Sequence, residues 1–177
     1  MSRAEAPSRR YVSRALFLAA AGFALRPLAA RAATLGERAD RVLVIKCKRR
    51  LVLLRRGRPL ASFPVALGFD PIGAKFERGD GRTPEGLYRV DWRNAHSRYH
   101  RALHLSYPNV ADIRRARAAG VAPGGDIEIH GLPDRFGDYD PRVFYRDWTD
   151  GCIAVCNPAI DEIWASVPLG TPVEIRA

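Results

Sequence analysis

A cysteine and a histidine, each beside a glycine, are the residues of this sequence best suited to nucleophilic chemistry. Gly151 directly precedes Cys152, so the backbone can turn tightly and present the sulfur at the start of a strand. The same turn leaves two neighbouring N–H groups free to face an oxyanion. His130 closes a predicted strand and is followed by Gly131. Because a nearby histidine can withdraw the thiol proton, Cys152 and His130 are candidates for covalent catalysis.

The order of the two residues narrows the class of enzyme. His130 precedes Cys152 in the chain, which excludes papain-like enzymes, where the cysteine comes first, and the caspase run Gln-Ala-Cys is absent. A solitary cysteine is more often a small buried hydrophobic residue than a nucleophile. The pair by itself therefore leaves a catalytic role and a packing role open.

Short runs that alternate in polarity predict a mainly β domain with short helices around this pair. Pro64 favours an edge or bulged position for the third strand, and residues 68–86 are expected to form a long loop. Helices are expected at 112–119 and from an N-cap at Asn157 to Val167, where apolar residues share one face. Strands are expected at 42–46, 50–55, 60–67, 87–92, 102–107, 126–130 and 171–176, the first three as an antiparallel meander.

Four motifs, in order along the chain, resemble the L,D-transpeptidase catalytic domain (YkuD-type). They are Arg82–Tyr88 (RTPEGLY), Ile129–Gly131 (IHG), Thr149–Ile153 (TDGCI) and Leu169–Ile175 (LGTPVEI). The resemblance covers roughly residues 41–176. It implies an L,D-transpeptidase-like β-sandwich. No cofactor is expected, and no metal ion either, because the three scattered cysteines match no zinc spacing.

The resemblance also implies a reaction on peptidoglycan. In the family, a cysteine attacks the L-to-D peptide bond after the diaminopimelate of a tetrapeptide stem, and the resulting thioester is resolved by an amine or by water. By motif position, Cys152 is the nucleophile and His130 the general base. The N–H groups of Gly151 and Cys152 would form the oxyanion hole, and the carbonyl of Gly131 would orient the histidine ring. Crosslink synthesis and hydrolysis both remain open, because they share the thioester.

Two departures from the family pattern bear on substrate binding. Members commonly read Ser-His-Gly-Cys-Ile-Arg, whereas this chain has Asp150 in place of the second histidine and Ala154 in place of the arginine. Arg146, or Arg135 and Arg142, could supply the missing carboxylate contact, since arginine pairs with carboxylates in a bidentate way. Thr149, Asp150 and Arg146 are the expected substrate-binding residues. Together with the runs Leu103–Asn109 and Asp147–Asp150, these departures resemble a sub-branch of the family. Some of its members resemble amidases that detach proteins from peptidoglycan.

Segment 1–32 is typical of an export signal, with a twin-arginine-like run at 8–12 and an apolar stretch from Ala15 to Leu25. An uncleaved inner-membrane anchor is the alternative, although the stretch is shorter than the ~20 residues that span a bilayer. The expected organisation is a signal at 1–32, a short segment at 33–40 and the catalytic domain at 41–177. The mature protein is expected to be periplasmic or extracytoplasmic and monomeric, without stable membrane insertion.

The composition of the chain argues against a disulfide scaffold and against a nucleic-acid-binding protein. The chain has 177 residues, a formal net charge of +10 and only 3 cysteines, which excludes a disulfide scaffold. Segment 1–32 carries six of the 29 Lys and Arg side chains and one of the 19 Asp and Glu side chains, so the rest of the chain has a net charge of +5. These remaining basic side chains are scattered rather than arranged in an aromatic-interleaved stripe, so no nucleic-acid partner is expected. A non-catalytic envelope-binding module on the same fold is the competing class.

The remaining cysteines, histidines and aspartates are weaker candidates, because their spacing gives little support for a redox or metal-binding role. Cys156 could be a resolving thiol, but a packing role is favoured, and Cys47 is expected to be structural. The histidines at 96, 100 and 104 would align on a helix, but residues 99–106 alternate more like a strand, so solvent or substrate-groove positions are favoured and no metal site is expected. The aspartates between the motifs fit a lid or a solvated loop better than a calcium site; they are Asp134, Asp138, Asp140 and Asp147.

Overall fold

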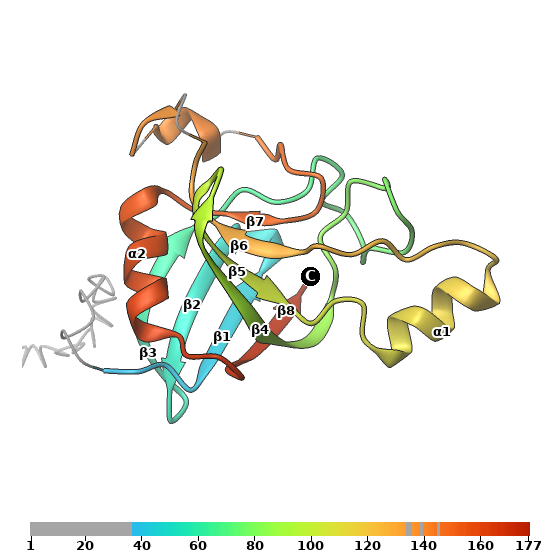
Figure 1. The fold of residues 1–177 in the computed structure, drawn as a ribbon, viewed down its shortest axis with the longest axis horizontal. Helices are drawn as coiled ribbons and strands as arrows, with labels where there is room; N and C mark the ends of the chain where they lie inside the picture. Colours follow the sequence, from blue (N-terminus) through green and yellow to red (C-terminus); the bar gives the residue numbers. More distant parts are fainter. Residues whose placement is uncertain (1–36, 134–135, 139, 145) are drawn as a thin grey trace, which may run out of the picture.

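An eight-stranded sheet with two short helices makes up the domain (Figure 1). The computed structural model describes residues 37–133, 136–138, 140–144 and 146–177, so the predicted signal lies outside the described residues. The strand order is β3-β2-β1-β8-β4-β5-β6-β7. This mainly β architecture confirms the fold class expected from the sequence. The strands are β1 (Arg41–Ile45), β2 (Arg50–Arg55), β3 (Arg58–Pro64), β4 (Gly86–Ser97), β5 (His100–Leu105), β6 (Glu128–His130), β7 (Ile153–Ala154) and β8 (Pro172–Arg176).

The predicted meander of three strands is confirmed. β1 pairs with β2 and β2 with β3, both antiparallel. Val42 and Val44 on β1 and Leu51 and Leu53 on β2 are fully buried, as expected when alternate side chains face the core. β3 is the outermost strand and ends at Pro64, where the lack of an N–H costs no ladder bond to a further strand.

Strand β4 is longer than predicted and joins the two halves of the sheet. Its first residues, Gly86–Arg89, pair with β8, while its second part pairs with β5 through two register shifts. The prediction ended this strand at Trp92 because the following residues are polar and hide the period-2 pattern. The extension carries the chain into a hairpin whose turn, residues 98–99, lies between β4 and β5.

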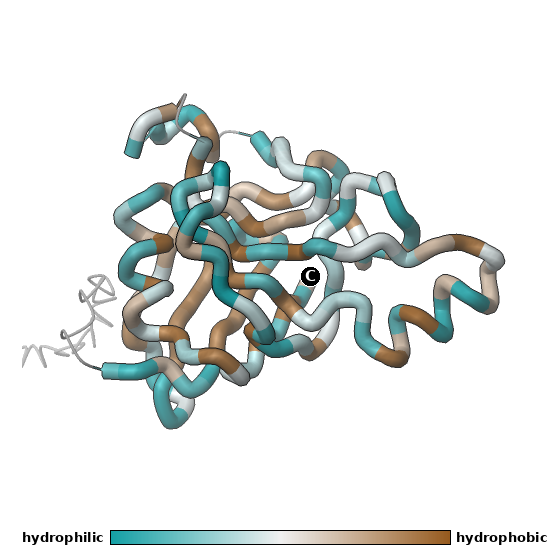
Figure 2. The backbone as a smooth tube through the Cα atoms, viewed as in Figure 1, coloured by the Kyte–Doolittle hydropathy of each residue, from teal (hydrophilic) through white to brown (hydrophobic). Residues whose placement is uncertain are grey.

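Figure 1 shows α2 (Asn157–Ser166) beside the strands and α1 (Val110–Ala118) at the opposite end of the domain, projecting away from the sheet. α1 begins two residues before the predicted start, because Asn109 and Asp112 form a capping box. α2 buries Ile160 and Ile163 against the core that Figure 2 shows as brown segments beneath it. No helix in the described part of the chain has the length and hydrophobicity needed to cross a membrane.

The predicted N-cap of the second helix is wrong by one residue. Cys156 occupies the N-cap position, and Asn157 is the first helical residue. The side chain of Asn157 accepts a hydrogen bond from the backbone N–H of Leu132 at 2.8 Å. This long-range contact near β6 takes precedence over local capping, and it ties the start of α2 to the residues that follow His130.

A buried lysine holds the long predicted loop against the meander. Lys46 lies just after β1, and its side chain is 3% exposed. Its ammonium donates to the carbonyl of Thr83 at 3.0 Å, to the carboxylate of Glu85 at 2.8 Å and to the carbonyl of Gly73. A buried cation needs such partners, because an unpaired charge in the interior is costly. The loop that leads to β4 is therefore fixed at both ends.

The substitution Lys46→Met is expected to lower the free energy of unfolding by about 2–4 kcal/mol, because it leaves buried acceptors without a donor. Urea unfolding followed by circular dichroism measures the change. Lys48→Met, at an exposed neighbouring lysine, is the matched control and should change stability by less than about 0.5 kcal/mol. Equal stability of the two variants would contradict the anchoring role.

Candidate functional site

Cys152 lies in a tight turn directly before β7, as the sequence predicted. The Thr149 hydroxyl donates to the carbonyl of Cys152 at 2.7 Å and accepts from the N–H of Gly151 at 3.2 Å, which closes the turn. Gly151 has a φ of +131°, and a Cβ there would lie 2.6 Å from the carbonyl oxygen of Arg82. Only glycine combines this backbone conformation with so close an approach.

The segment after β3 holds this turn through backbone hydrogen bonds. The carbonyl of Leu67 accepts from the N–H groups of Trp148 and Thr149, both at 3.1 Å, and Phe69 N–H donates to Thr149 at 2.8 Å. Ala66 and Ala154 exchange two hydrogen bonds, at 3.0 and 2.9 Å. The nucleophile candidate is thus placed by pairing between segments that lie far apart in the sequence.

Asp147 stabilises the same junction with its carboxylate. It accepts from the backbone N–H of Leu67 at 2.8 Å and pairs with the guanidinium of Arg49, with a closest contact of 2.7 Å. Arg49 follows the short 3-10 helix Lys46–Lys48. Asp147 therefore has a structural partner on each side, and its place in the predicted lid segment is fixed by the meander.

His130 ends β6 with a defined ring orientation. Its Nδ1 lies 2.7 Å from the carbonyl oxygen of Gly131, the contact expected for this pair, so Nδ1 carries the proton and Nε2 keeps its lone pair. Tyr99 stacks on the ring at a centroid distance of 4.3 Å, and Trp148 approaches it edge-on at 6.0 Å. A Cβ at Gly131 would lie 2.6 Å from Asn157 Oδ1, so the glycine permits this close packing.

Burial keeps both members of the pair neutral. Desolvation raises the pKa of Cys152 to about 11, with Glu128, Asp150 and Asp126 acting in the same direction and the Glu128 N–H opposing them. Desolvation lowers the pKa of His130 to about 4; its hydrogen bond to Gly131 opposes the shift and the charge of Arg98 adds to it. The Cys152 thiol is 3.5 Å from the carbonyl of Asp126. At neutral pH the site thus holds a thiol and an unprotonated imidazole.

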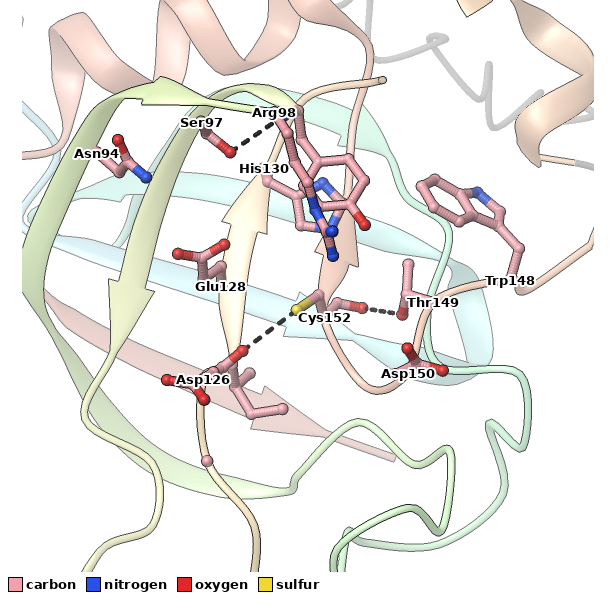
Figure 3. A pocket seen from close by; sticks show the side chains of 13 residues that line it. Asn94, Ser97, Arg98, Asp126, Glu128, His130, Trp148, Thr149, Asp150 and Cys152 are labelled. Atoms are coloured by element: carbon pink, nitrogen blue, oxygen red, sulfur yellow. Dashed lines mark hydrogen bonds between the residues drawn. The ribbon is translucent and has the colours of Figure 1, made fainter. Parts of the chain in front are cut away.

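Cys152 and His130 open into one pocket of about 750 Å³ (Figure 3). Three carboxylates and one guanidinium supply its charged side chains, and burial raises the pKa of one of the carboxylates, Glu128. The lining residues are Asn94, Ser97, Arg98, Tyr99, Gly125, Asp126, Ile127, Glu128, His130, Trp148, Thr149, Asp150 and Cys152.

The predicted substrate-binding residues lie in two different hollows of the structure. Thr149 and Asp150 line the pocket, although the Thr149 hydroxyl is engaged in the turn. Arg146 is exposed and lines a second hollow that shares only Trp148 with the first. Arg142 pairs with Asp140 at 2.8 Å, and residue 135 lies outside the described residues.

Sequence reasoning missed the pocket residues Arg98, Asp126 and Glu128. Arg98 lies in a hairpin turn that the prediction left outside both flanking strands, so no periodic signal marked it. Asp126 and Glu128 fall in the predicted strand that ends at His130, and their alternation with Ile127 was the only clue that they share a face with the histidine.

The other cysteines and histidines considered in the sequence analysis do not line the pocket of Cys152 and His130. Cys156 packs against the core, and the exposed Cys47 thiol contacts the carbonyl of Ala177 at 3.4 Å. His100 and His104 pair with Asp161 and Asp91 respectively. Within the described ranges, no group of three His, Cys, Asp or Glu residues is arranged to hold a metal ion.

Comparison with known proteins identifies relatives over most of the domain. Residues 39–175 match the family model of the L,D-transpeptidase catalytic domain (YkuD). The Escherichia coli K12 protein named "Putative L,D-transpeptidase YafK" is 33% identical over 112 residues, which are 61% of this chain and 37% of that protein. This chain therefore spans little more than a third of the curated relative.

Two solved structures share the fold. The helical cell shape determining protein Pgp2 from Campylobacter jejuni is 27% identical with a TM-score of 0.58, over 77% of this chain and 46% of Pgp2. Bd1075 from Bdellovibrio bacteriovorus is 25% identical with a TM-score of 0.56, over 83% of this chain and 51% of Bd1075. Both are longer proteins of which this chain resembles about half.

Gly151→Ala is expected to destabilise the protein by at least about 2 kcal/mol, since the methyl group would meet the Arg82 carbonyl and the φ is unfavourable for alanine. Thermal and urea unfolding measure the loss. Gly125→Ala serves as the control, because a Cβ there meets nothing within 4 Å. A Gly151→Ala protein as stable as the control would show that the turn can relax.

Alkylation by iodoacetamide tests the protonation state of the pair. With a thiol pKa of about 11, the Cys152 rate should still rise about tenfold per pH unit between pH 7 and pH 10. Mass spectrometry of the Cys152 peptide in a Cys47→Ser background gives the rate. A plateau below pH 8 would instead indicate a thiolate–imidazolium pair.

Proposed function

The chain belongs to the L,D-transpeptidase catalytic domain family, which acts on peptidoglycan, and on that premise we propose that it is a cysteine-dependent acyltransferase of peptidoglycan stem peptides. The observation that supports this proposal most directly is the shared pocket of Cys152 and His130, with the ring held through Nδ1 so that Nε2 is available. A lone pair on Nε2 is what a general base requires.

The first half-reaction forms a thioester. Nε2 of His130 takes the thiol proton as Sγ of Cys152 bonds to the carbonyl carbon of the L-to-D peptide bond. The tetrahedral oxyanion then collapses, the C–N bond breaks, and the histidine proton passes to the leaving amine. Because the resting thiol and imidazole are both neutral, the proton moves during attack rather than beforehand.

The oxyanion would be stabilised mainly by one backbone donor. The N–H of Gly151 points to the Thr149 hydroxyl at 3.2 Å, whereas the Cys152 N–H has no hydrogen-bond partner among the described residues. Donors aimed at the developing charge are among the largest contributions to catalysis. We assign the Cys152 N–H as the primary donor, with the Gly151 N–H joining if the Thr149 hydroxyl turns away.

The second half-reaction determines the product. An amine that attacks the thioester carbonyl gives its proton to His130, the C–S bond breaks, and the proton passes from His130 to the departing Cys152 sulfur, which leaves a crosslink. Water in the same place gives a carboxylate and also restores the Cys152 thiol. Hydrolysis, as an amidase or carboxypeptidase, is the alternative function. The replacement of the family arginine by Ala154 is the observation that supports this alternative. The comparison with a cell shape determining protein supports a role in cell-wall remodelling in either case.

The proposed site of action is the cell envelope. The leader-like segment 1–32 and the peptidoglycan substrate both favour a periplasmic or extracytoplasmic protein. A binding module that keeps the fold without the chemistry would show affinity for sacculi but no thioester.

Activity assays with tetrapeptide muropeptides and with protein-linked sacculi test the proposal. Cys152→Ala is expected to abolish product formation, and His130→Gln to reduce it by about 10²–10⁴-fold. Cys47→Ala, at an exposed thiol outside the pocket, is the matched control and should retain full activity. Chromatography with mass spectrometry separates new crosslinks from hydrolysed stems and released protein.

Three results would count against the proposal. Activity that survives in Cys152→Ala excludes a cysteine nucleophile. Full activity of His130→Gln excludes the histidine as base. Sedimentation of the wild-type protein with sacculi, without any product, favours the binding module.

A further inference from the structure

Arg98, in the turn between β4 and β5, is the residue that the pocket offers to an anionic group of the substrate. We propose that its guanidinium binds one of the two carboxylates that flank the scissile bond of the stem, on the diaminopimelate side chain or on the leaving D-amino acid. This inference rests on the proposed function and replaces the expectation that Arg146 makes this contact.

The position of Arg98 fits this role. It lines the same pocket as Cys152 and His130, and Figure 3 shows its side chain extending past the histidine toward the cysteine. Its Cζ lies 4.9 Å from the centroid of the Tyr99 ring, which in turn stacks on His130 at 4.3 Å. The aromatic ring thus supports the guanidinium and the imidazole together.

The charges in the pocket make Arg98 the counterion for an incoming carboxylate. Asp126, Glu128 and Asp150 line the same walls, and their negative charges would repel an anionic substrate. Arg98 is the one Lys or Arg among the described lining residues. Without its guanidinium, the proposed substrate would have to bring its own carboxylates into a purely acidic pocket.

Arg98 is also available, whereas neighbouring arginines are not. Arg49 is paired with Asp147 and Arg82 with Asp70, but in the described part of the chain no carboxylate forms an ion pair with Arg98. Its electrostatic effect reaches both His130 and Glu128, which places the charge close to the reacting groups. A planar guanidinium with free N–H groups can hold a carboxylate through two parallel hydrogen bonds.

The position that carries the arginine in the family pattern has no room for one here. Ala154 is fully buried in β7, and both its backbone groups bond to Ala66. A long charged side chain at this position would have to displace packed core residues. The hairpin turn above the pocket instead supplies the cation from a much earlier part of the chain.

The inference is tested by assaying the wild-type protein, Arg98→Ala and Arg98→Lys on substrates that differ only in one carboxylate. The probes are a tetrapeptide stem with both flanking carboxylates free and two stems in which one or the other is amidated. For the wild type, kcat/KM should fall about ten- to a hundredfold when the carboxylate that contacts Arg98 is amidated. For Arg98→Ala, kcat/KM on the free acid should be as low as that of the wild type on the amide, mostly through a higher KM. Amidation of that carboxylate should lower the kcat/KM of Arg98→Ala no further.

Control measurements separate binding from structure. Arg114→Ala, at an exposed arginine on α1, should keep the wild-type preference for the acid. Arg98→Lys should recover part of that preference, because it restores the charge but not the bidentate geometry. Unfolding midpoints of the Arg98 variants should match that of the wild type.

The failures of the two proposals are distinguishable. If the wild type reacts with none of the three stems, or if Cys152→Ala reacts as well as the wild type, the proposed function fails. If the reaction depends on Cys152 but Arg98→Ala still discriminates acid from amide as the wild type does, the assignment of Arg98 is overturned.

Discussion

The site depends on the close approach of the turn before Cys152 to the segment that follows β3 and to the backbone of Arg82. Gly151 must pass so near the Arg82 carbonyl that any side chain would collide with it. The Leu67 carbonyl accepts hydrogen bonds from the turn and the Phe69 N–H donates one to it. Together with the Ala66–Ala154 exchange, these bonds fix the cysteine at the start of β7. β7 has only two residues, so its position comes from this pairing together with its parallel ladder to β6, in which Ala154 lies opposite His130.

The same close packing sets the chemistry of the pair. Burial disfavours charge on both Cys152 and His130, so the site rests as thiol and imidazole. In the proposed reaction, the thiol proton would therefore move only as the sulfur bonds to the substrate. The Gly131 carbonyl decides which nitrogen of the ring carries the proton and which keeps its lone pair. The tautomer of His130 and the protonation states of both residues are therefore consequences of how the site is packed.

Much of the fold could be predicted because it is encoded locally. The meander follows from alternating apolar residues on β1 and β2, and α2 follows from the apolar spacing of Ile160 and Ile163. Predictions were wrong where distant contacts outweigh local preferences. Asn157 reads as an N-cap, yet its side chain bonds to Leu132, and β4 continues beyond Trp92 because β5 pairs with it.

The sequence by itself determined the residue types and local turns of the site: a cysteine after a glycine, a histidine at a strand end, and the motifs that resemble one family. Only the tertiary structure decided what surrounds them. The pairing of β4 with β5 and of β5 with β6 carries Arg98 over the pocket, while Arg146, much closer to Cys152 in sequence, lines another hollow. Periodicity along a chain reports which face a side chain occupies, but neighbours across a sheet depend on strand order and register, which no local pattern contains.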